Sequence, residues 1–270
     1  MKQISIANGS VLNVHDEGRG PILLLVHGFP LDHSMWDGQI AGLADRFRVI
    51  APDLSGFGRS TFRTDFDQQS PVTTMETFAD ELAALLDALQ VQQKISLCGL
   101  SMGGYIAWQF WRRHRRRLDK LIVCDTRAVA DPPEVARGRQ LMAQRVLEEG
   151  AAPVAETMRP KLFADATHNR SPAIVAQTVQ VMLDTSPLAI AAAQNGMAQR
   201  PDVTSWLPQI DVPTLVLVGQ SDVISPVAEM RDIAAAIPRA AFVEIAGAGH
   251  MAPLEDPAAV NAAIAAHCAG

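Results

Sequence analysis

The chain has 270 residues, enough for one large α/β domain or two smaller ones. Hydrophobic residues make up 48% and charged residues 19%, which is typical of a globular protein with a substantial core. The net charge of −6 argues against a surface for nucleic acids or anionic membranes. No apolar run approaches the roughly 18 residues of a membrane span, and the first residues contain no apolar signal region. We therefore expect no membrane partner and no secretory signal.

Cysteines are few: Cys98, Cys124 and Cys268. An odd, sparse count without metal-type spacing indicates a reducing compartment, so we expect a cytoplasmic protein without a metal site. Cys98 and Cys124 lie in apolar runs, which predicts that both are small buried hydrophobic residues. No pattern in the chain calls for a cofactor.

The first third of the chain predicts a hairpin followed by buried strands. Residues 1–20 alternate apolar and polar around Asn8-Gly9, the pattern of an edge β-hairpin. Continuous apolar runs at 21–26 and 48–53 are typical of parallel strands that are buried on both faces. Apolar residues at helical spacing over 75–89 predict an amphipathic helix that packs on the sheet.

The turn after the first buried strand reads His27-Gly28-Phe29-Pro30. Gly28 can present the next N–H outward, so in an acyl-transfer enzyme Phe29 would supply one oxyanion donor. We expect His27 to be structural, because a histidine beside a turn more often bonds the backbone than performs chemistry. Asp53, which precedes the glycine-rich loop at 54–60, is expected to cap that loop. The loop lacks phosphate-binding spacing.

Ser101 lies in the motif Gly99-Leu100-Ser101-Met102-Gly103, between an apolar run at 95–98 and a helix-like segment at 105–113. A serine in G-x-S-x-G between a strand and a helix indicates a nucleophile elbow. Such a turn strains the serine backbone, and the two glycines leave room for it, so the hydroxyl stands clear at the edge of the sheet. The N–H of Met102, directly after the serine, is the second expected oxyanion donor.

The sharpest charge cluster is RRHRRR at 112–117. It has the composition of a nucleic-acid or localisation patch. It also ends the helix that follows the serine, where cations meet the negative end of the helix dipole. With an acidic net charge, we interpret the run as a solvated helix end and predict no nucleic-acid partner.

The pattern changes over 131–207, where helical stretches rich in Ala, Gln and Met replace the strand-like runs and prolines divide them. We predict a helical cap (a lid) at 131–207, inserted between two strands of a core domain formed by 1–130 and 208–270. Methionines are usually core filler, and some can line an adaptable apolar pocket.

Three further strands are predicted at 118–126, 213–218 and 241–245, and Asp256-Pro257 is a good helix start. Strands thus alternate with helices, which predicts the α/β class, a mostly parallel central sheet with helices on both faces. Right-handed crossovers place the carboxyl ends of such strands along one edge, and ligands bind there.

A candidate catalytic triad appears at these strand ends in the order Ser101, Asp222, His250. Serine needs a base to take its proton and an acid to orient that base, and this order is that of an α/β-hydrolase triad. His250 is favoured as the base because it follows a sheet strand. Asp222 is favoured as the acid because Gly219, Ser221 and Pro226 form a tight loop around it. Asp125, at the end of the preceding sheet strand, is the alternative acid.

Five motifs follow one another: HGFP at 27–30, DLSGFGRS at 53–60, GLSMGG at 99–104, GQSD at 219–222 and GH at 249–250. Together they resemble the α/β-hydrolase family over nearly the whole chain. HGFPLDHSMW and GLSMGG are similar to small bacterial carboxylesterases, cofactor-free perhydrolases and 3-oxoadipate enol-lactonases. The serine nucleophile departs from haloalkane dehalogenases and epoxide hydrolases, which use aspartate, and the cap matches no specific family.

The triad and the resemblance predict a serine carboxylesterase that acts on a small-molecule ester through an acyl-enzyme intermediate. Apolar Phe29, Met102 and Trp36 indicate a small to medium hydrophobic acyl group, and Trp36 is expected to contact the substrate. Enol-lactone hydrolysis, perhydrolysis and carbon–carbon bond hydrolysis use the same triad and stay open. An enol-lactonase would need a cationic group for its dicarboxylate substrate. A ligand receptor that keeps the fold with little turnover is the alternative from another class.

Overall fold

An eight-stranded sheet runs through the molecule in the computed structural model, which describes residues 1–269. Its order is β1-β2-β4-β3-β5-β6-β7-β8. The pairs β1–β2 and β2–β4 are antiparallel, and the other pairs are parallel. The strands are β1 (Lys2–Ser5), β2 (Val11–Gly18), β3 (Ile22–Val26), β4 (Arg48–Pro52), β5 (Ile95–Leu100), β6 (Leu118–Cys124), β7 (Thr214–Gly219) and β8 (Ala240–Ile245). The predicted mostly parallel α/β sheet with an edge hairpin is confirmed.

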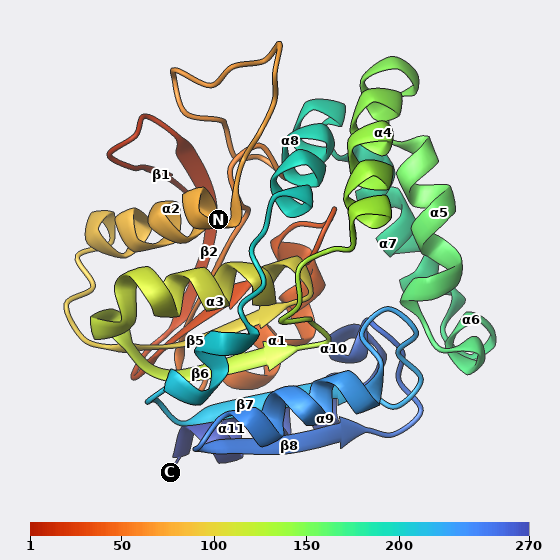
Figure 1. Ribbon diagram of the computed structural model, residues 1–270. Helices are drawn as coiled ribbons and strands as arrows, with labels where there is room; N and C mark the ends of the chain where they lie inside the picture. Colours follow the sequence, from red (N-terminus) through yellow and green to blue (C-terminus); the bar gives the residue numbers. More distant parts are fainter. Residues whose placement is uncertain (270) are drawn as a thin grey trace.

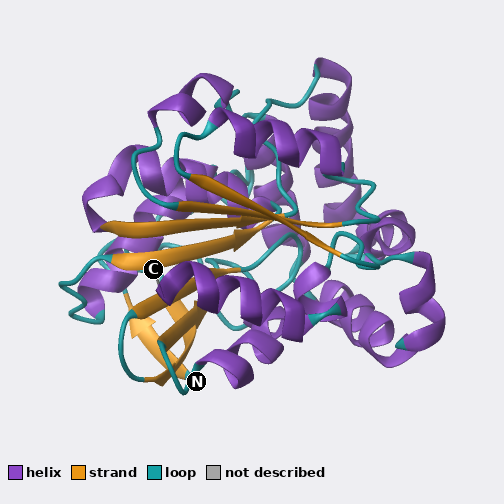
Figure 2. Cartoon of the chain, turned by 90° about the horizontal axis from the view of Figure 1, so that it is seen from below, coloured by secondary structure: helices purple, strands orange, loops and turns teal. Residues whose placement is uncertain are grey.

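Helices cover both faces of this sheet (Figures 1 and 2). One hydrophobic cluster contains residues of α2, α3 and α9, and a second contains residues of α1, α10 and α11. The helices of the two layers are α1 (Asp37–Leu43), α2 (Met75–Ala88), α3 (Met102–His114), α9 (Val227–Ala236), α10 (Ala252–Glu255) and α11 (Pro257–Ala269), with short 3-10 helices η1 (His33–Trp36), η2 (Arg115–Arg117) and η3 (Thr204–Gln209).

The central strand β3 shows why its apolar run is continuous rather than alternating. Ile22, Leu24 and Val26 belong to the cluster under α2 and α3, whereas Leu23 and Leu25 belong to the cluster on the opposite face. All five side chains are buried, because successive residues of a strand point to opposite faces and both faces are covered. This burial holds the carboxyl end of β3, and hence the turn after it, in one position.

Five helices lie between β6 and β7 and gather at the upper right of the molecule (Figure 1). They are α4 (Pro133–Glu149), α5 (Ala152–Leu162), α6 (Asp165–Arg170), α7 (Pro172–Asp184) and α8 (Pro187–Ala198). α4 packs on α5 and α8, and α7 packs on α5 and α6. We call residues 131–207 the cap segment; its assignment as a separate cap domain stays a prediction.

No single described helix is long and apolar enough to cross a membrane. Helices α7 and α8 together reach the length and composition of a span, but a bend of 93° separates them. Of the two, α8 is largely buried, from Ala189 to Gln194 and again at Gly196 and Met197.

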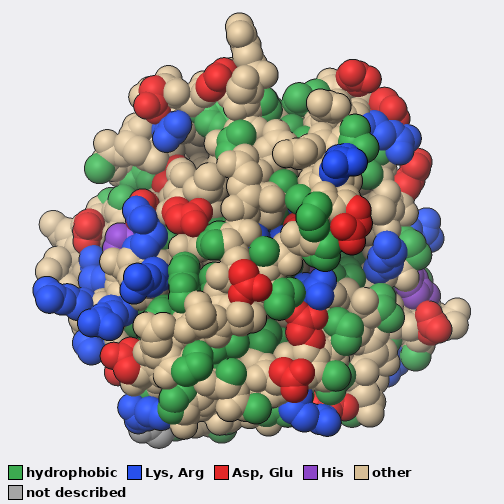
Figure 3. All heavy atoms as spheres, viewed as in Figure 1, with side chains coloured by type: hydrophobic (Ala, Val, Ile, Leu, Met, Phe, Trp, Pro, Cys, Tyr) green, Lys and Arg blue, Asp and Glu red, His purple; other side chains and the backbone are tan. Residues whose placement is uncertain are grey.

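The basic run at the end of α3 lies on the surface, where blue side chains gather at the left of Figure 3. Arg113 and His114 both bond the carboxylate of Asp80, and Arg117 bonds Asp87. Both acids belong to α2, so the run pairs with the neighbouring helix of the same chain. This arrangement is that of a solvated helix end, as the sequence predicts.

Asp53 caps the loop at 54–60, as expected from the sequence. Its carboxylate, 1% exposed, accepts hydrogen bonds from the backbone N–H and Nδ1 of His33, from the Arg59 N–H and from Nδ2 of Asn13. Burial by itself would raise the pKa of this carboxyl, but the four donors outweigh it and lower the pKa of Asp53 to about 2. The ionised carboxylate therefore holds η1 and the loop against β2.

Replacing Asp53 with Asn should lower the free energy of unfolding at pH 7 by about 2 kcal/mol, because a carboxyl whose folded pKa lies below its unfolded value stabilises the native state when ionised. This stabilisation is complete above about pH 4 and is lost as the pH falls through the folded value of about 2. The difference between wild type and Asp53→Asn in urea denaturation should thus shrink to about half by pH 3. A difference that stays constant over this range would contradict the assignment.

Candidate active site

Ser101 stands between the end of β5 and the start of α3 in a strained conformation. Its φ is 55° and its ψ is −111°, a region that non-glycine residues rarely occupy. The Ser101 N–H donates to the Cys124 carbonyl at 2.9 Å, and the Thr126 hydroxyl donates to the Ser101 carbonyl at 2.8 Å. Two bonds to the end of β6 thus hold the strained turn in place, which fulfils the structural context expected of a nucleophile elbow.

Gly99 and Gly103, on either side of the serine, lie so close to neighbouring backbone atoms that no side chain fits there. A Cβ on Gly99 would lie 2.2 Å from the Gly103 carbonyl oxygen, and a Cβ on Gly103 would lie 2.3 Å from the Val26 carbonyl oxygen. The elbow therefore packs backbone to backbone on itself and on the end of β3. This packing brings the turn after β3 next to the serine: a Cβ on Gly28 would lie 3.6 Å from Ser101 Cβ.

Two backbone N–H groups are free beside Ser101. Within the described residues, neither the Phe29 N–H nor the Met102 N–H has an acceptor. Met102 is the first residue of α3, so its N–H has no intrahelical partner and lies at the positive end of the helix dipole. These are the two donors that the sequence predicts for an oxyanion hole, and their assignment to that role remains a prediction.

His27 keeps the turn after β3 in shape. It is fully buried; its Nε2 accepts the Leu54 N–H at 3.0 Å, so Nδ1 carries the proton and donates to the Gly28 carbonyl at 2.9 Å. Burial lowers the pKa of His27, which favours the neutral ring that this pattern requires. The structural role expected for His27 agrees with these contacts.

His250 and Asp222 form a buried pair. His250 Nδ1 lies 2.9 Å from Asp222 Oδ2, with 2% and 0% of the two side chains exposed. Asp222 Oδ1 accepts the N–H groups of Ile224 and Ser225, at 2.7 and 3.1 Å. A carboxylate accepts but does not donate, so Nδ1 of His250 holds the proton and Nε2 is left as a base. Ser101 Oγ and His250 share no hydrogen bond in residues 1–269, and in empty sites such bonds often form only when substrate binds.

The loops that carry Asp222 and His250 are packed directly on each other. A Cβ on Gly219 would lie 1.9 Å from the Gly249 carbonyl oxygen, and the Ser221 N–H donates to the Ala248 carbonyl. Glu255 of α10 fixes the histidine loop further, because it accepts the Gly249 N–H at 2.7 Å. Asp222 and His250 are therefore aligned by backbone contacts between the ends of β7 and β8.

Glu255 also connects the site to the cap segment. The same carboxylate accepts the Ala164 N–H at 3.0 Å and the Thr167 hydroxyl at 2.5 Å. Glu255 and Thr126 are positioning residues that the sequence analysis did not identify. In the sequence, only their position marks them: Glu255 lies five residues after His250, and Thr126 directly follows Asp125. This position does not reveal which groups they bond.

Asp125, the alternative acid, lies in the same cluster. One ligand atom each from Asp125, Asp222 and His250 lie within 4.8 Å of one another. The hydrogen bond to His250 Nδ1 nevertheless comes from Asp222, whereas Asp125 Oδ1 accepts the Gly219 N–H at 2.7 Å. The geometry therefore supports Asp222 as the acid, with Asp125 as its neighbour bonded to the backbone of Gly219.

Trp36 is fully buried in η1 and belongs to the hydrophobic cluster with α1 and α11. With no exposed surface, Trp36 is a core residue in this conformation, and its expected substrate contact remains a prediction.

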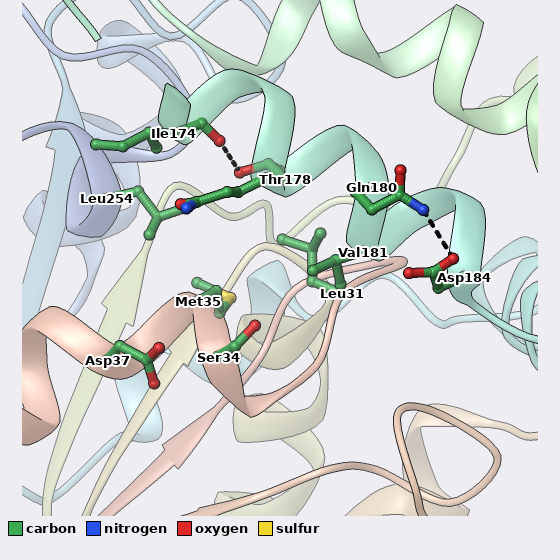
Figure 4. A pocket seen from close by; sticks show the side chains of 11 residues that line it. Leu31, Ser34, Met35, Asp37, Ile174, Thr178, Gln180, Val181, Asp184 and Leu254 are labelled. Atoms are coloured by element: carbon green, nitrogen blue, oxygen red, sulfur yellow. Dashed lines mark hydrogen bonds between the residues drawn. The ribbon is translucent and has the colours of Figure 1, made fainter. Parts of the chain in front are cut away.

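Next to Trp36, a pocket of about 420 Å³ opens between η1 and α7 (Figure 4). Leu31, Met35 and Val181 supply apolar lining, and Met35 Sδ accepts the Gly28 N–H at 3.3 Å, so the pocket borders the turn beside the serine. None of the triad residues lines it.

Comparison with known proteins agrees with this geometry. The family model described as alpha/beta hydrolase fold matches residues 21–257, and the chain belongs to the α/β-hydrolase family. The AB hydrolase superfamily protein YisY of Bacillus subtilis is 31% identical over 262 residues, which are 94% of each chain. The 3-oxoadipate enol-lactonase 2 of Acinetobacter baylyi is 30% identical over 91% of this chain and 88% of its own length. A solved thermophilic esterase from Thermogutta terrifontis, with malate bound, is 46% identical, covers 99% of this chain and 97% of its own, and superimposes with a TM-score of 0.94.

Replacing Gly103 with Ala should disrupt the elbow, because the new methyl group would lie 2.3 Å from the Val26 carbonyl oxygen, a backbone atom that cannot rotate away. We expect a loss of about 3 kcal/mol or more in the free energy of unfolding, measured by urea denaturation. Gly138→Ala on α4 is the matched control. Its Cβ would meet no atom within 4 Å, so this variant should be neutral or slightly more stable. Equal stability of both variants would contradict the close packing at the elbow.

Proposed function

We propose that the protein is a carboxylic ester hydrolase in which Ser101, His250 and Asp222 form the catalytic triad. The observation that carries the proposal is the buried His250–Asp222 pair at 2.9 Å, which lies at strand ends on the same edge of the sheet as the strained Ser101 turn. The similarity to a solved esterase and to an enol-lactonase supports ester chemistry in particular.

In this mechanism Nε2 of His250 takes the proton of Ser101 as the hydroxyl attacks the ester carbonyl, and Asp222 holds the resulting imidazolium. The Phe29 and Met102 N–H groups bind the oxyanion, since both lack another acceptor. His250 then protonates the leaving alkoxide and activates a water that releases the acyl group from Ser101. Each role uses a group that its environment has already oriented.

The substrate that we propose is a small-molecule ester with a small to medium hydrophobic acyl group. Leu31, Met35 and Val181 give an apolar lining to the pocket that borders the turn at Gly28, which supports this choice of substrate. We place the protein in the cytoplasm; its three free thiols, two of them fully buried, support a reducing compartment.

Replacing Ser101 with Ala should lower kcat for p-nitrophenyl esters, from acetate to decanoate, by about 10⁴- to 10⁶-fold, because the nucleophile is removed while the rest of the site is kept. The wild type should show its highest kcat/KM at one acyl length within this series. Ser96→Ala removes a buried serine of β5, the strand that precedes Ser101, and should keep the wild-type rate. If Ser101→Ala retained most of the activity, the triad assignment would be wrong. A wild type that hydrolyses none of these esters would indicate either a specialised substrate or a ligand receptor with little turnover.

A second candidate is hydrolysis of an enol-lactone that carries a carboxylate. Arg139 and Arg200 share the single carboxylate of Asp131, so this cluster keeps one positive charge. The Arg200 guanidinium lies 4.3 Å from the ring centroid of Tyr105, one helical turn after Ser101. We propose that this cluster supplies the cationic group that a dicarboxylate substrate requires.

If the carboxylated lactone is the substrate, Arg139→Gln should raise the KM for this lactone about tenfold and leave the KM for a neutral aryl ester unchanged. Only the lactone has a carboxylate that would lose a charge-assisted hydrogen bond to Arg139. Arg137→Gln, an exposed neighbour on α4, controls for a general change in charge. Equal effects on both substrates, or no lactone turnover by the wild type, would leave the simple esterase as the function.

A further inference from the structure

Asp125 occupies an unusual position at the end of β6. Its backbone φ is 47°, in the left-handed region that residues other than glycine seldom adopt. Its side chain is fully buried, and Oδ1 accepts the Gly219 N–H at 2.7 Å. Oδ2 has no partner among the described residues and is buried as well. A strained backbone that carries an unpaired buried oxygen indicates a role beyond packing.

The Asp125 carboxyl lies beside the proposed catalytic acid and base, because one ligand atom each of Asp125, Asp222 and His250 lies within 4.8 Å of the other two. The two carboxyl groups differ in their donors. Asp222 accepts three N–H groups, from Ile224, Ser225 and His250, whereas Asp125 accepts one. A negative charge is therefore better supported on Asp222.

Two buried carboxylates this close cannot both ionise without a counter-charge. The titratable groups that face Asp125 are Asp222, His250 and Cys124, and no lysine or arginine within residues 1–269 pairs with it. Burial first, and then the charge of Asp222, raises the pKa of Asp125 well above its usual range. The proton of the pair thus resides on Asp125.

We propose that Asp125 is a positioning residue of the His250–Asp222 pair: its carboxyl stays protonated, and its Oδ2–H donates a hydrogen bond to the Asp222 carboxylate. The inference rests on the proposed triad. A neutral acid fixes the orientation of Asp222 without adding a second negative charge near His250. A second negative charge there would favour the imidazolium form of His250, which cannot act as a base.

Infrared spectroscopy tests the protonation state without any need for turnover. At pH 8 the wild type should show the carbonyl stretch of a protonated carboxylic acid that Asp125→Asn removes. Burial also raises the pKa of Glu81, so Glu81→Gln serves to separate any band from that residue. Asp53→Asn, which removes an ionised buried carboxylate, should leave the band intact. Absence of an Asp125 band at pH 8 would overturn the inference.

The hydrogen bond to Asp222 has its own readout. In Asp222→Asn the neighbouring charge is gone, so the Asp125 band should titrate at a lower pH than in the wild type. An Asp125 carboxyl that did not contact Asp222 would show a much weaker dependence, and an unchanged titration would overturn the proposed bond.

Kinetics complete the test. Asn tolerates a positive φ, can accept the Gly219 N–H and can donate to Asp222, so Asp125→Asn should fold, as circular dichroism can verify. Its kcat/KM should exceed that of Asp125→Leu, which cannot donate to Asp222, and the acidic limb of its pH–rate profile should be unmoved. A shift of that limb by a whole pH unit toward lower pH would mean that Asp125 is ionised in the wild type and would refute the proposal. If the Asp125 band is present but Ser101→Ala remains active, the proposed triad fails while the protonation of Asp125 stands.

Discussion

The backbone contact at the elbow is the constraint on which the site depends. Gly99 touches Gly103, and Gly103 touches the end of β3, so that no side chain separates these segments. The contact forces Ser101 into its strained turn and places the first N–H of α3 and the turn at Gly28 on either side of it. The proposed nucleophile and the proposed oxyanion donors are thus positioned by one steric arrangement, which the buried sheet beneath it makes rigid.

The acid and base are organised by electrostatics rather than by strain. Asp222 is buried, yet it accepts three N–H groups, one of them from His250. Burial excludes water and strengthens these bonds, and it also makes a second charge costly. For this reason the nearby Asp125 is not a competitor for the acid role: a buried cluster that includes one histidine accommodates a single carboxylate, and the other carboxyl serves as a neutral donor.

Much of the fold could be predicted, because continuous apolar runs identify strands buried on both faces and because parallel strands place their carboxyl ends on one edge. Ser101, Asp222 and His250 were proposed as a triad in this way, from motifs and chain order. The positions of Glu255 and Thr126 could not be predicted, since each acts on backbone groups that carry no sequence signal. The complete burial of Trp36 also escaped prediction, because an aromatic residue after a strand has the same pattern whether it faces the core or a ligand.

The sequence by itself determined the α/β architecture, the elbow and the order of the candidate triad, because these depend on local periodicity and on residue types with one steric or chemical use. Only the tertiary structure decided which aspartate faces His250. Asp125 and Asp222 both follow sheet strands, and the loop around Asp222 favoured it in the sequence without excluding Asp125. The distinction arises where the ends of β6, β7 and β8 meet: the loop after β7 directs two backbone N–H groups at Asp222, and Asp125 is left with one. The negative charge is most stable on the carboxylate with more hydrogen-bond donors, and it is the folded structure that brings these donors together.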